Sequence, residues 1–282
     1  GTAGAELNWF TFEDYKAPTT PGYESGYLQN NNFRNRMYNF ELLALYNNSW
    51  GDFDFNATLG GNLYKVNNQT IVTTAKDMKI RDVVALMSFN EVSVEPYSYR
   101  KQINSIYGAV NLGWKHMLYF DATLRGDQSS TLPISNNMYI YPSFSGSFVF
   151  SELLKLGDKL PYGKVRMSWA QVGSDTDPYQ LGLVYTKSKF AYPGYTIGYI
   201  SNGTIPNKDL KPTKTNSFEM GLELKFLKNR IGLDFTYYSQ LSKNQIMGMA
   251  SSSTSGYGYR LINAGEIENK GVEIALNTRP IQ

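Results

Sequence analysis

The feature that most constrains this chain is a strict alternation of apolar and polar side chains between residues 217 and 238. It is interrupted once, at residues 227–230, which have the composition of a turn. Because successive side chains of a β-strand point to opposite faces, this period predicts two strands, each with one apolar and one polar face. We expect each strand to run about ten residues, the length that a tilted strand needs to cross a bilayer. The apolar positions are Phe218, Met220, Leu222, Leu224, Phe226, Ile231, Leu233, Phe235 and Tyr237.

The alternation recurs along the chain, and we expect about ten to twelve strands in total. Composition agrees with an all-β protein, because the 282 residues include 22 Tyr and 15 Phe, which favour strands. We find no apolar run near the roughly 18 residues of a membrane helix, which excludes a helical membrane protein. The other alternating segments are 52–59, 106–114, 118–125, 144–150, 164–169 and 272–276, with weaker candidates at 7–15 and 38–46.

The predicted links between strands differ in length in a regular way. Short or intermediate links alternate with long polar ones, and the intermediate link is expected to hold one helical turn at residues 152–156. A transmembrane β-barrel has short periplasmic turns and long extracellular loops, whereas a sandwich has no reason to place every long loop at one end. The links are 47–52, 113–117, 151–163 and 227–230 on the short side, and 16–36, 66–96, 126–138, 173–216 and 243–269 on the long side. The pattern favours a barrel whose periplasmic turns lie near Trp50 and Trp114, in keeping with an aromatic girdle.

Charge and cysteine content exclude several other classes of function. The net charge of +3 is too weak to indicate a nucleic-acid partner. Cys is absent, which is compatible both with a barrel that needs no disulfides and with a cytosolic protein. The chain begins at Gly1, without Met and without a signal peptide, so we expect it to be a fragment of a longer protein.

The sequence offers no convincing catalytic or metal-binding group. His116 is the only His, and we expect it to be a turn residue, because a zinc site or a catalytic triad needs further ligands or partners. Glu219 and Glu223 share a strand face with other charged residues and are better explained as a charged wall than as a glycosidase pair. Asp175 and Asp177 resemble a calcium loop but lack its Gly and later Glu, so turn formation is the better interpretation. We therefore expect a non-enzyme without metal or cofactor.

Exposed tyrosines in two of the long links are the candidate ligand contacts. A tyrosine offers a flat apolar face and a hydrogen-bonding tip, which suits stacking on a sugar ring or gripping a peptide. The same residues would also suit packing between loops or against a lid protein. The candidates are Tyr192, Tyr195 and Tyr199 in one link and Tyr257 and Tyr259 in the other.

Several motifs in order resemble the late barrel of SusC/RagA-type TonB-dependent transporters of Bacteroidetes. The resemblance covers most of residues 97–280, and Ser174 stands where the family usually has Asn. The motifs are YPSFSGSF at 141–148, RMSWAQVGSD at 166–175, LKPTKTNSFEMGLE at 210–223, FLKNRI at 226–231, the pair Tyr237 and Tyr238, and NAGEIENKGVEI at 263–274.

The resemblance implies that residues 1–282 form a partial arc from an outer-membrane β-barrel of about 22 strands. No plug domain is recognised in the chain. The intact protein would import a glycan, oligosaccharide or peptide across the outer membrane of a Gram-negative bacterium. It would draw energy from TonB through the plug and work beneath a SusD-like surface lipoprotein. The apolar strand faces would contact outer-membrane lipid.

Two other interpretations remain open at this point. The chain may be read as a self-contained outer-membrane barrel of about twelve strands, either a porin or an enzyme. It may also be read as a soluble β-sandwich that binds carbohydrate through Tyr192 and Tyr195.

Overall fold

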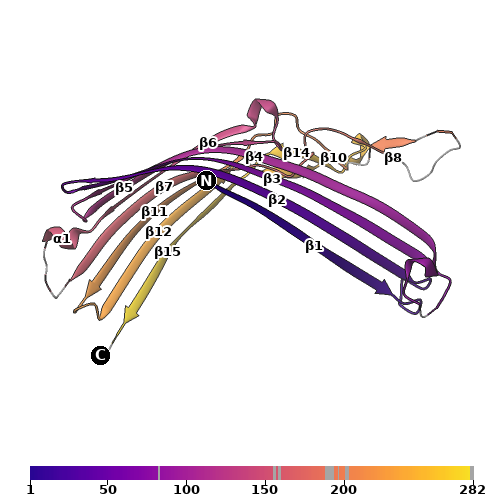
Figure 1. Cartoon of the computed structure of the whole chain (residues 1–282), viewed down its shortest axis with the longest axis horizontal. Helices are drawn as coiled ribbons and strands as arrows, with labels where there is room; N and C mark the ends of the chain where they lie inside the picture. Colours follow the sequence, from indigo (N-terminus) through magenta and orange to yellow (C-terminus); the bar gives the residue numbers. More distant parts are fainter. Residues whose placement is uncertain are drawn as a thin grey trace. The chain divides into compact units, whose positions relative to one another are not determined.

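The computed structural model describes residues 1–81, 83–154, 157, 160–187, 194–195, 197–200 and 203–279. Ten strands form one antiparallel sheet in which each strand lies beside its neighbour in the chain, in the order β1-β2-β3-β4-β5-β6-β7-β11-β12-β15 (Figure 1). The sheet is not closed, so β1 and β15 are its edges. The bounds are β1 Thr2–Lys16, β2 Tyr27–Trp50, β3 Phe53–Met78, β4 Phe89–Trp114, β5 Leu118–Ser129, β6 Met138–Phe148, β7 Tyr162–Ser174, β11 Thr213–Phe226, β12 Ile231–Lys243 and β15 Glu266–Thr278. This confirms the expected all-β antiparallel fold and a strand number within the expected range.

The remaining elements are short and belong to the links. Two small sheets are formed by β8 (Tyr185–Lys187) with β9 (Gly198–Ile200), and by β10 (Thr204–Ile205), β14 (Tyr259–Asn263) and β13 (Ile246–Ala250). The described helices are α1 (Phe150–Leu154) and the 3-10 turns η1 (Leu86–Ser88), η2 (Ile134–Asn136) and η4 (Ser253–Ser255). Helix α1 agrees with the helical turn expected near residues 152–156. Among the described residues, no helix has the length and hydropathy needed to span a membrane.

The chain divides into two compact units. The first comprises Gly1–Glu41 and Leu63–Ile103, and the second comprises Leu42–Asn62 and Asn104–Gln282. Strands β2, β3 and β4 contribute one part to each unit.

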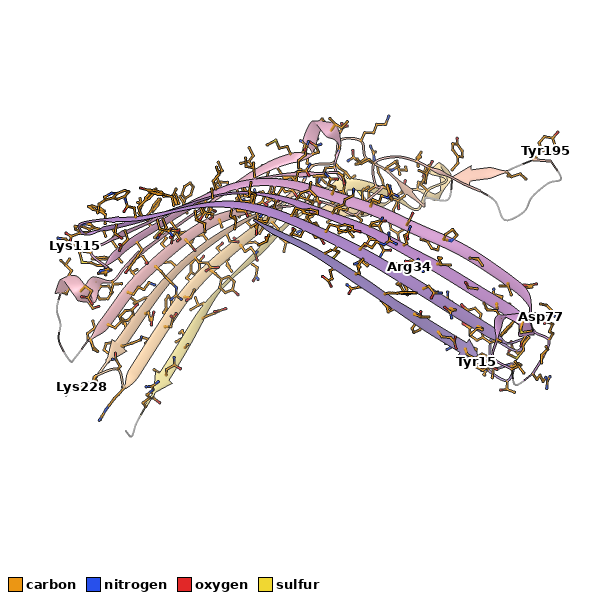
Figure 2. All side chains as sticks on the ribbon, viewed as in Figure 1. Tyr15, Arg34, Asp77, Lys115, Tyr195 and Lys228 are labelled. Atoms are coloured by element: carbon orange, nitrogen blue, oxygen red, sulfur yellow. The ribbon has the colours of Figure 1, made fainter. Side chains whose placement is uncertain are left out.

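In the first unit, β1 pairs with β2 without interruption from Thr2↔Glu41 to Lys16↔Tyr27. Tyr15 and Asp77 lie at the same end of this unit (Figure 2). At this end, Leu28, Ala75 and Phe89 form a buried cluster, and Tyr15 and Met78 pack against it. Backbone hydrogen bonds from Met78 N to Ser25 O (2.7 Å) and from Lys79 N to Ser88 O (2.8 Å) hold the two links at this end.

In the second unit, the short turns lie where the sequence predicted them. Strand β11 ends at Phe226 and β12 begins at Ile231, and the pair runs in register from Lys214↔Lys243 to Phe226↔Ile231. Lys115 and Lys228, each in a short turn, lie at the same end of this unit (Figure 2). His116 also lies in such a turn, with a φ of 55°, as expected. The short turns 51–52, 115–117 and 227–230 alternate with longer links, but the link 149–161 is longer than the links 17–26, 79–88 and 130–137, so the expected alternation of link lengths is only partly present.

Three expectations were wrong. The strands are longer than about ten residues, since β2 has 24 and β3 and β4 have 26 each. Much of the expected long links 16–36 and 66–96 is strand, because β2 begins at Tyr27 and β3 extends to Met78. These segments carry polar side chains on both faces, so they lack the apolar period of a half-buried strand, yet their neighbours satisfy their backbone hydrogen bonds. Phe150 is also not on a strand face but begins α1.

The apolar face of the second unit is not a packed core. Phe218, Leu222, Leu233 and Phe235 are half-buried, and neither of the two buried clusters contains them. A soluble sandwich would enclose these residues between two sheets. The arrangement among the described residues does not support the sandwich interpretation.

Leu210 lies at the centre of the buried cluster of the second unit, so its truncation tests whether that cluster orders the links. The fully buried Leu210 packs with Leu132, Tyr139 and Leu261. We expect Leu210→Ala to lower the free energy of local opening by about 2–5 kcal/mol, through lost burial and the cavity left behind. Amide hydrogen exchange across residues 129–139 and 259–263 measures this change. The exposed Leu183→Ala is the matched control, with an expected effect within about 0.5 kcal/mol. Equal effects of the two substitutions would contradict this role of the cluster.

Candidate functional site

The apolar side chains of the second unit are aligned in rows across the strands. Because each pair is in register, one row crosses six strands through consecutive cross-strand pairs. Its members, from β15 to β5, are Ile274, Phe235, Leu222, Val165, Phe148 and Leu118. Ile274 is 68% exposed and Leu118 is 46% exposed, so the row faces the outside of the protein. A continuous apolar row of this kind is typical of a surface that contacts lipid or another protein.

Aromatic side chains gather at both limits of this apolar face. Near the short turns, Trp50 contacts Phe55 with ring centroids 5.8 Å apart, and Phe53 contacts Trp114 at 6.3 Å. At the other limit, Trp169 stacks on Phe144 at 6.0 Å and pairs with Phe218. This arrangement agrees with the aromatic girdle expected around Trp50 and Trp114.

The spacing of the two aromatic groups matches a membrane. Phe218 and Phe226 on β11 are eight residues apart, which is about 26 Å along a strand at about 3.3 Å per residue. A strand tilt of about 40° reduces this to about 20 Å perpendicular to the membrane, close to the roughly 25 Å apolar band of outer-membrane barrels.

The opposite face of the same strands carries a network of charged and polar groups. Arg166 on β7 reaches across β11 to β12, where its Nη1 and Nη2 donate to Asp234 Oδ2 and Oδ1, both at 2.9 Å, and Nη2 also donates to Thr236 Oγ1 at 2.7 Å. Gly221 lies beneath the guanidinium, and a Cβ there would approach Arg166 Nε to 2.5 Å. A glycine is therefore needed at 221 for the side chain to cross. Glu223 is on this face, within 3.5 Å of Lys225, which supports a charged wall.

A second group of polar contacts joins β4, β5 and β6 on this polar face. Arg125 Nε donates to Asp127 Oδ1 at 2.9 Å, its Nη2 donates to Ser105 Oγ at 3.0 Å, and its Cζ lies 5.3 Å from the Tyr107 ring centroid. Tyr141 donates to the other oxygen of Asp127. Two hydrogen bonds to different residues together with the stacked ring contact suit the planar guanidinium of Arg better than Lys at this position.

At the end of the sheet opposite the short turns, Asp175 organises the link between β5 and β6. Its Oδ2 accepts hydrogen bonds from Ser129 Oγ at 2.5 Å and from Thr131 Oγ1 at 3.2 Å. Ser129 and Thr131 are buried and also hydrogen-bond to each other at 3.0 Å, so the carboxylate completes a small buried polar network. Asp175 thus has a structural role, but through side chains of a distant link and not through the turn that the sequence favoured.

Asn263, which sequence analysis did not identify as a functional residue, joins two further links. Its Oδ1 accepts from Lys211 N at 2.8 Å, while its Nδ2 donates to Lys211 O at 2.8 Å and to Asn244 O at 3.0 Å. Lys211 directly follows Leu210, a member of the buried cluster, in the chain. The sequence around Asn263 shows only that an asparagine precedes Ala-Gly. This does not reveal its partners, because Asn244 is 19 residues away and Lys211 is 52 residues away.

The candidate tyrosines that the structure describes lie in two links, the one between β7 and β11 and the one between β12 and β15. Tyr195 is 73% exposed and lies in the outer part of the connection between β8 and β9 (Figure 2). Tyr259 begins β14, pairs with Ala250 and is exposed, and Tyr257 is half-buried. Tyr192 lies outside the described residues, and for Tyr199 only the backbone, in β9, is described. A role of these tyrosines in ligand binding stays a prediction.

The described residues contain no group of three or more His, Asp or Glu side chains placed to hold a metal ion. The side chain of His116 is 85% exposed, and its Nδ1 is 3.9 Å from an Asp54 carboxylate oxygen.

Comparison with known proteins identifies the family. The family described as "TonB dependent receptor-like, beta-barrel" matches residues 2–279, and the chain belongs to it. Relatives include TonB-dependent receptor P3 of Formosa agariphila, 26% identical over 252 residues (86% of this chain, 25% of the relative), and TonB-dependent receptor SusC of Bacteroides thetaiotaomicron, 27% identical over 193 residues (66% and 19%). Among solved structures, the RagAB peptide transporter has a TM-score of 0.87 at 21% identity, over 99% of this chain and 32% of that chain.

Family membership makes the chain part of an outer-membrane β-barrel, as the motifs had implied. It spans about a quarter or less of the length of these two curated relatives. The apolar rows therefore face lipid, and the network around Arg166 and Arg125 faces the barrel interior.

The contact of Asn263 with two links can be tested by an isosteric change. Asn263→Asp keeps the acceptor for Lys211 N but removes the two N–H donors of the side-chain amide. A carboxylate oxygen then faces the carbonyl oxygens of Lys211 and Asn244. We expect local opening at residues 206–212 to become easier by about 1–3 kcal/mol, measured by amide hydrogen exchange. Asn207→Asp is the control, because the Asn207 side chain acts only as the acceptor for Asp209 N. Unchanged exchange at 206–212 in Asn263→Asp would show that this contact does not hold the links.

Proposed function

We propose that this chain forms part of the wall and outer links of a nutrient importer in the outer membrane. The observation that carries the proposal is a single sheet with a lipid-facing apolar side and a charged inner side. Family membership and the similarity to SusC and to the RagAB peptide transporter support import as the activity. The curated relatives are named as receptors, which supports a transporter rather than an enzyme.

The proposed cargo is a glycan, oligosaccharide or peptide. Import is energised through TonB, and a SusD-like surface lipoprotein covers the outer links. The charged inner face contributes to this activity by keeping the interior wet and polar, so that a hydrophilic cargo is not desolvated against apolar side chains. The tyrosine-bearing links are proposed to contact cargo or the covering lipoprotein at the entrance.

The facing assignment gives a sharp stability test at two adjacent residues. Leu222 lies in the middle of the apolar row and its neighbour Glu223 points to the inner face, opposite Asp234. We expect Leu222→Arg to destabilise the full-length barrel by about 2–4 kcal/mol, because it places a charge in hydrocarbon. Glu223→Arg should cost much less, because the new charge faces water, although it loses the 3.5 Å contact with Lys225. Chemical unfolding in lipid vesicles measures both, and equal costs would refute the assignment.

Import itself is tested in the source bacterium with the full-length gene deleted. We expect uptake of a glycan or peptide to be lost, to return with the full-length gene, and to stop when a protonophore collapses the proton gradient. Size-limited diffusion that is insensitive to the protonophore would instead show a porin. Deleting the gene of a neighbouring surface lipoprotein tests the proposed cover, and unaltered uptake would remove that part of the proposal.

A further inference from the structure

One face of the first unit carries a stacked pair of side chains between two hollows. Trp9 on β1 and Arg34 on β2 are cross-strand partners, and Arg34 Cζ lies 4.8 Å from the Trp9 ring centroid. One hollow, of about 400 Å³, is lined by this pair and by residues of β3 and β4. The other, of about 460 Å³, is lined by this pair and by neighbouring residues of β1 and β2. Figure 2 shows Arg34 in the middle of these strands, away from the links at their end.

The lining of the hollows combines three kinds of chemistry. Trp9, 70% exposed, supplies a broad aromatic surface. Asn32, Gln69 and Ser98 supply amide and hydroxyl groups in the first hollow. Arg36 adds a second guanidinium in the other hollow, two residues from Arg34 and so about 7 Å further along the strand.

Arg34 has no acidic partner within the described part of the chain. Its recorded contact is the Trp9 ring, and no described carboxylate pairs with it or with Arg36. The guanidinium groups therefore keep their donors available for an anion, and Arg suits a carboxylate because it can donate two parallel hydrogen bonds.

Joining β1 to β2 does not require the contact between Trp9 and Arg34. On the opposite face of the same two strands, Phe10 stacks on Phe33 with ring centroids 4.5 Å apart, and this pair already joins β1 to β2 by an apolar contact. An exposed cation–π pair adds only about 0.5–1 kcal/mol. The arrangement of Trp9 and Arg34 is better explained by recognition of something outside the chain.

We propose that the two hollows and the pair between them bind an extended acidic glycan, such as a chain of uronic acids. A sugar ring stacks on Trp9, the amide and hydroxyl groups bind its hydroxyls, and Arg34 and Arg36 pair with carboxylates of successive sugars. An acidic peptide can also pair with the two guanidinium groups, and polyglutamate of equal charge is the test of that alternative. The binding site is proposed independently of transport. Its test uses purified protein and needs neither TonB nor a proton gradient.

The test measures binding of a short oligogalacturonate to the purified full-length protein by titration calorimetry. Arg34→Gln and Trp9→Leu are each expected to weaken binding about tenfold or more, and raising the salt concentration should weaken it further. Arg230→Ala, which removes a positive charge in a short turn of the second unit, is the matched control and should leave binding unchanged. Circular dichroism establishes that each variant is folded, and Arg34→Lys, which keeps the charge but loses the planar group, should bind with intermediate affinity.

The same oligosaccharide with its carboxylates reduced to alcohols separates charge from shape. We expect it to bind at least about tenfold more weakly than the acid form. The proposal is overturned if the reduced oligosaccharide binds equally well, if folded Arg34→Gln and Trp9→Leu both bind like the unaltered protein, or if polyglutamate of equal charge binds as tightly. Loss of uptake in the source bacterium bears on transport and leaves this result unaffected.

Discussion

The structure depends on one sheet having a different solvent on each side. Hydrocarbon offers no hydrogen-bond partners, so every backbone N–H and C=O within the membrane must be satisfied by a neighbouring strand. The in-register pairs of β5 to β7, β11, β12 and β15 meet this requirement, and they also align Leu222, Phe235 and Ile274 into one row. A shift of one residue would turn this row to the barrel interior and bring Glu223 into lipid, so the same pairing that satisfies the backbone also sets the facing of every side chain.

The inner face is organised differently, by long side chains that cross strands. Arg166 spans β11 to reach Asp234, and Arg125 joins Asp127, Ser105 and Tyr107. These groups remain partly hydrated, so their pairing contributes modestly to stability. Their larger effect is to fix a charged, wet lining along which a polar cargo can pass. The position of Arg166 on this inner face depends on Gly221, because any side chain at 221 would displace the Arg166 guanidinium.

The ends of the strands opposite the short turns need cores of their own, because water rather than lipid surrounds them. In the second unit, Leu210 and its neighbours provide such a core, and Asn263 and Asp175 tie the links together with hydrogen bonds. In the first unit, Leu28, Ala75 and Phe89 do the same. The proposed glycan site around Trp9 lies on strands rather than links, so its geometry does not depend on link conformation. Rigid strands position recognition groups more reliably than loops do.

The sequence by itself determined the strands whose two faces meet different solvents, because a two-residue period is a local property. The turn at residues 227–230 and the apolar positions of β11 and β12 were predictable on that basis. The polar outer parts of β2 and β3 were not, because side chains alike on both faces leave no period to detect. Only the tertiary structure decided that Asn263 reaches Lys211 and Asn244, that Arg166 crosses above Gly221, and that Trp9 meets Arg34. Each of these contacts joins residues from different strands or links, and strand register, which no local pattern encodes, decides which of them become neighbours.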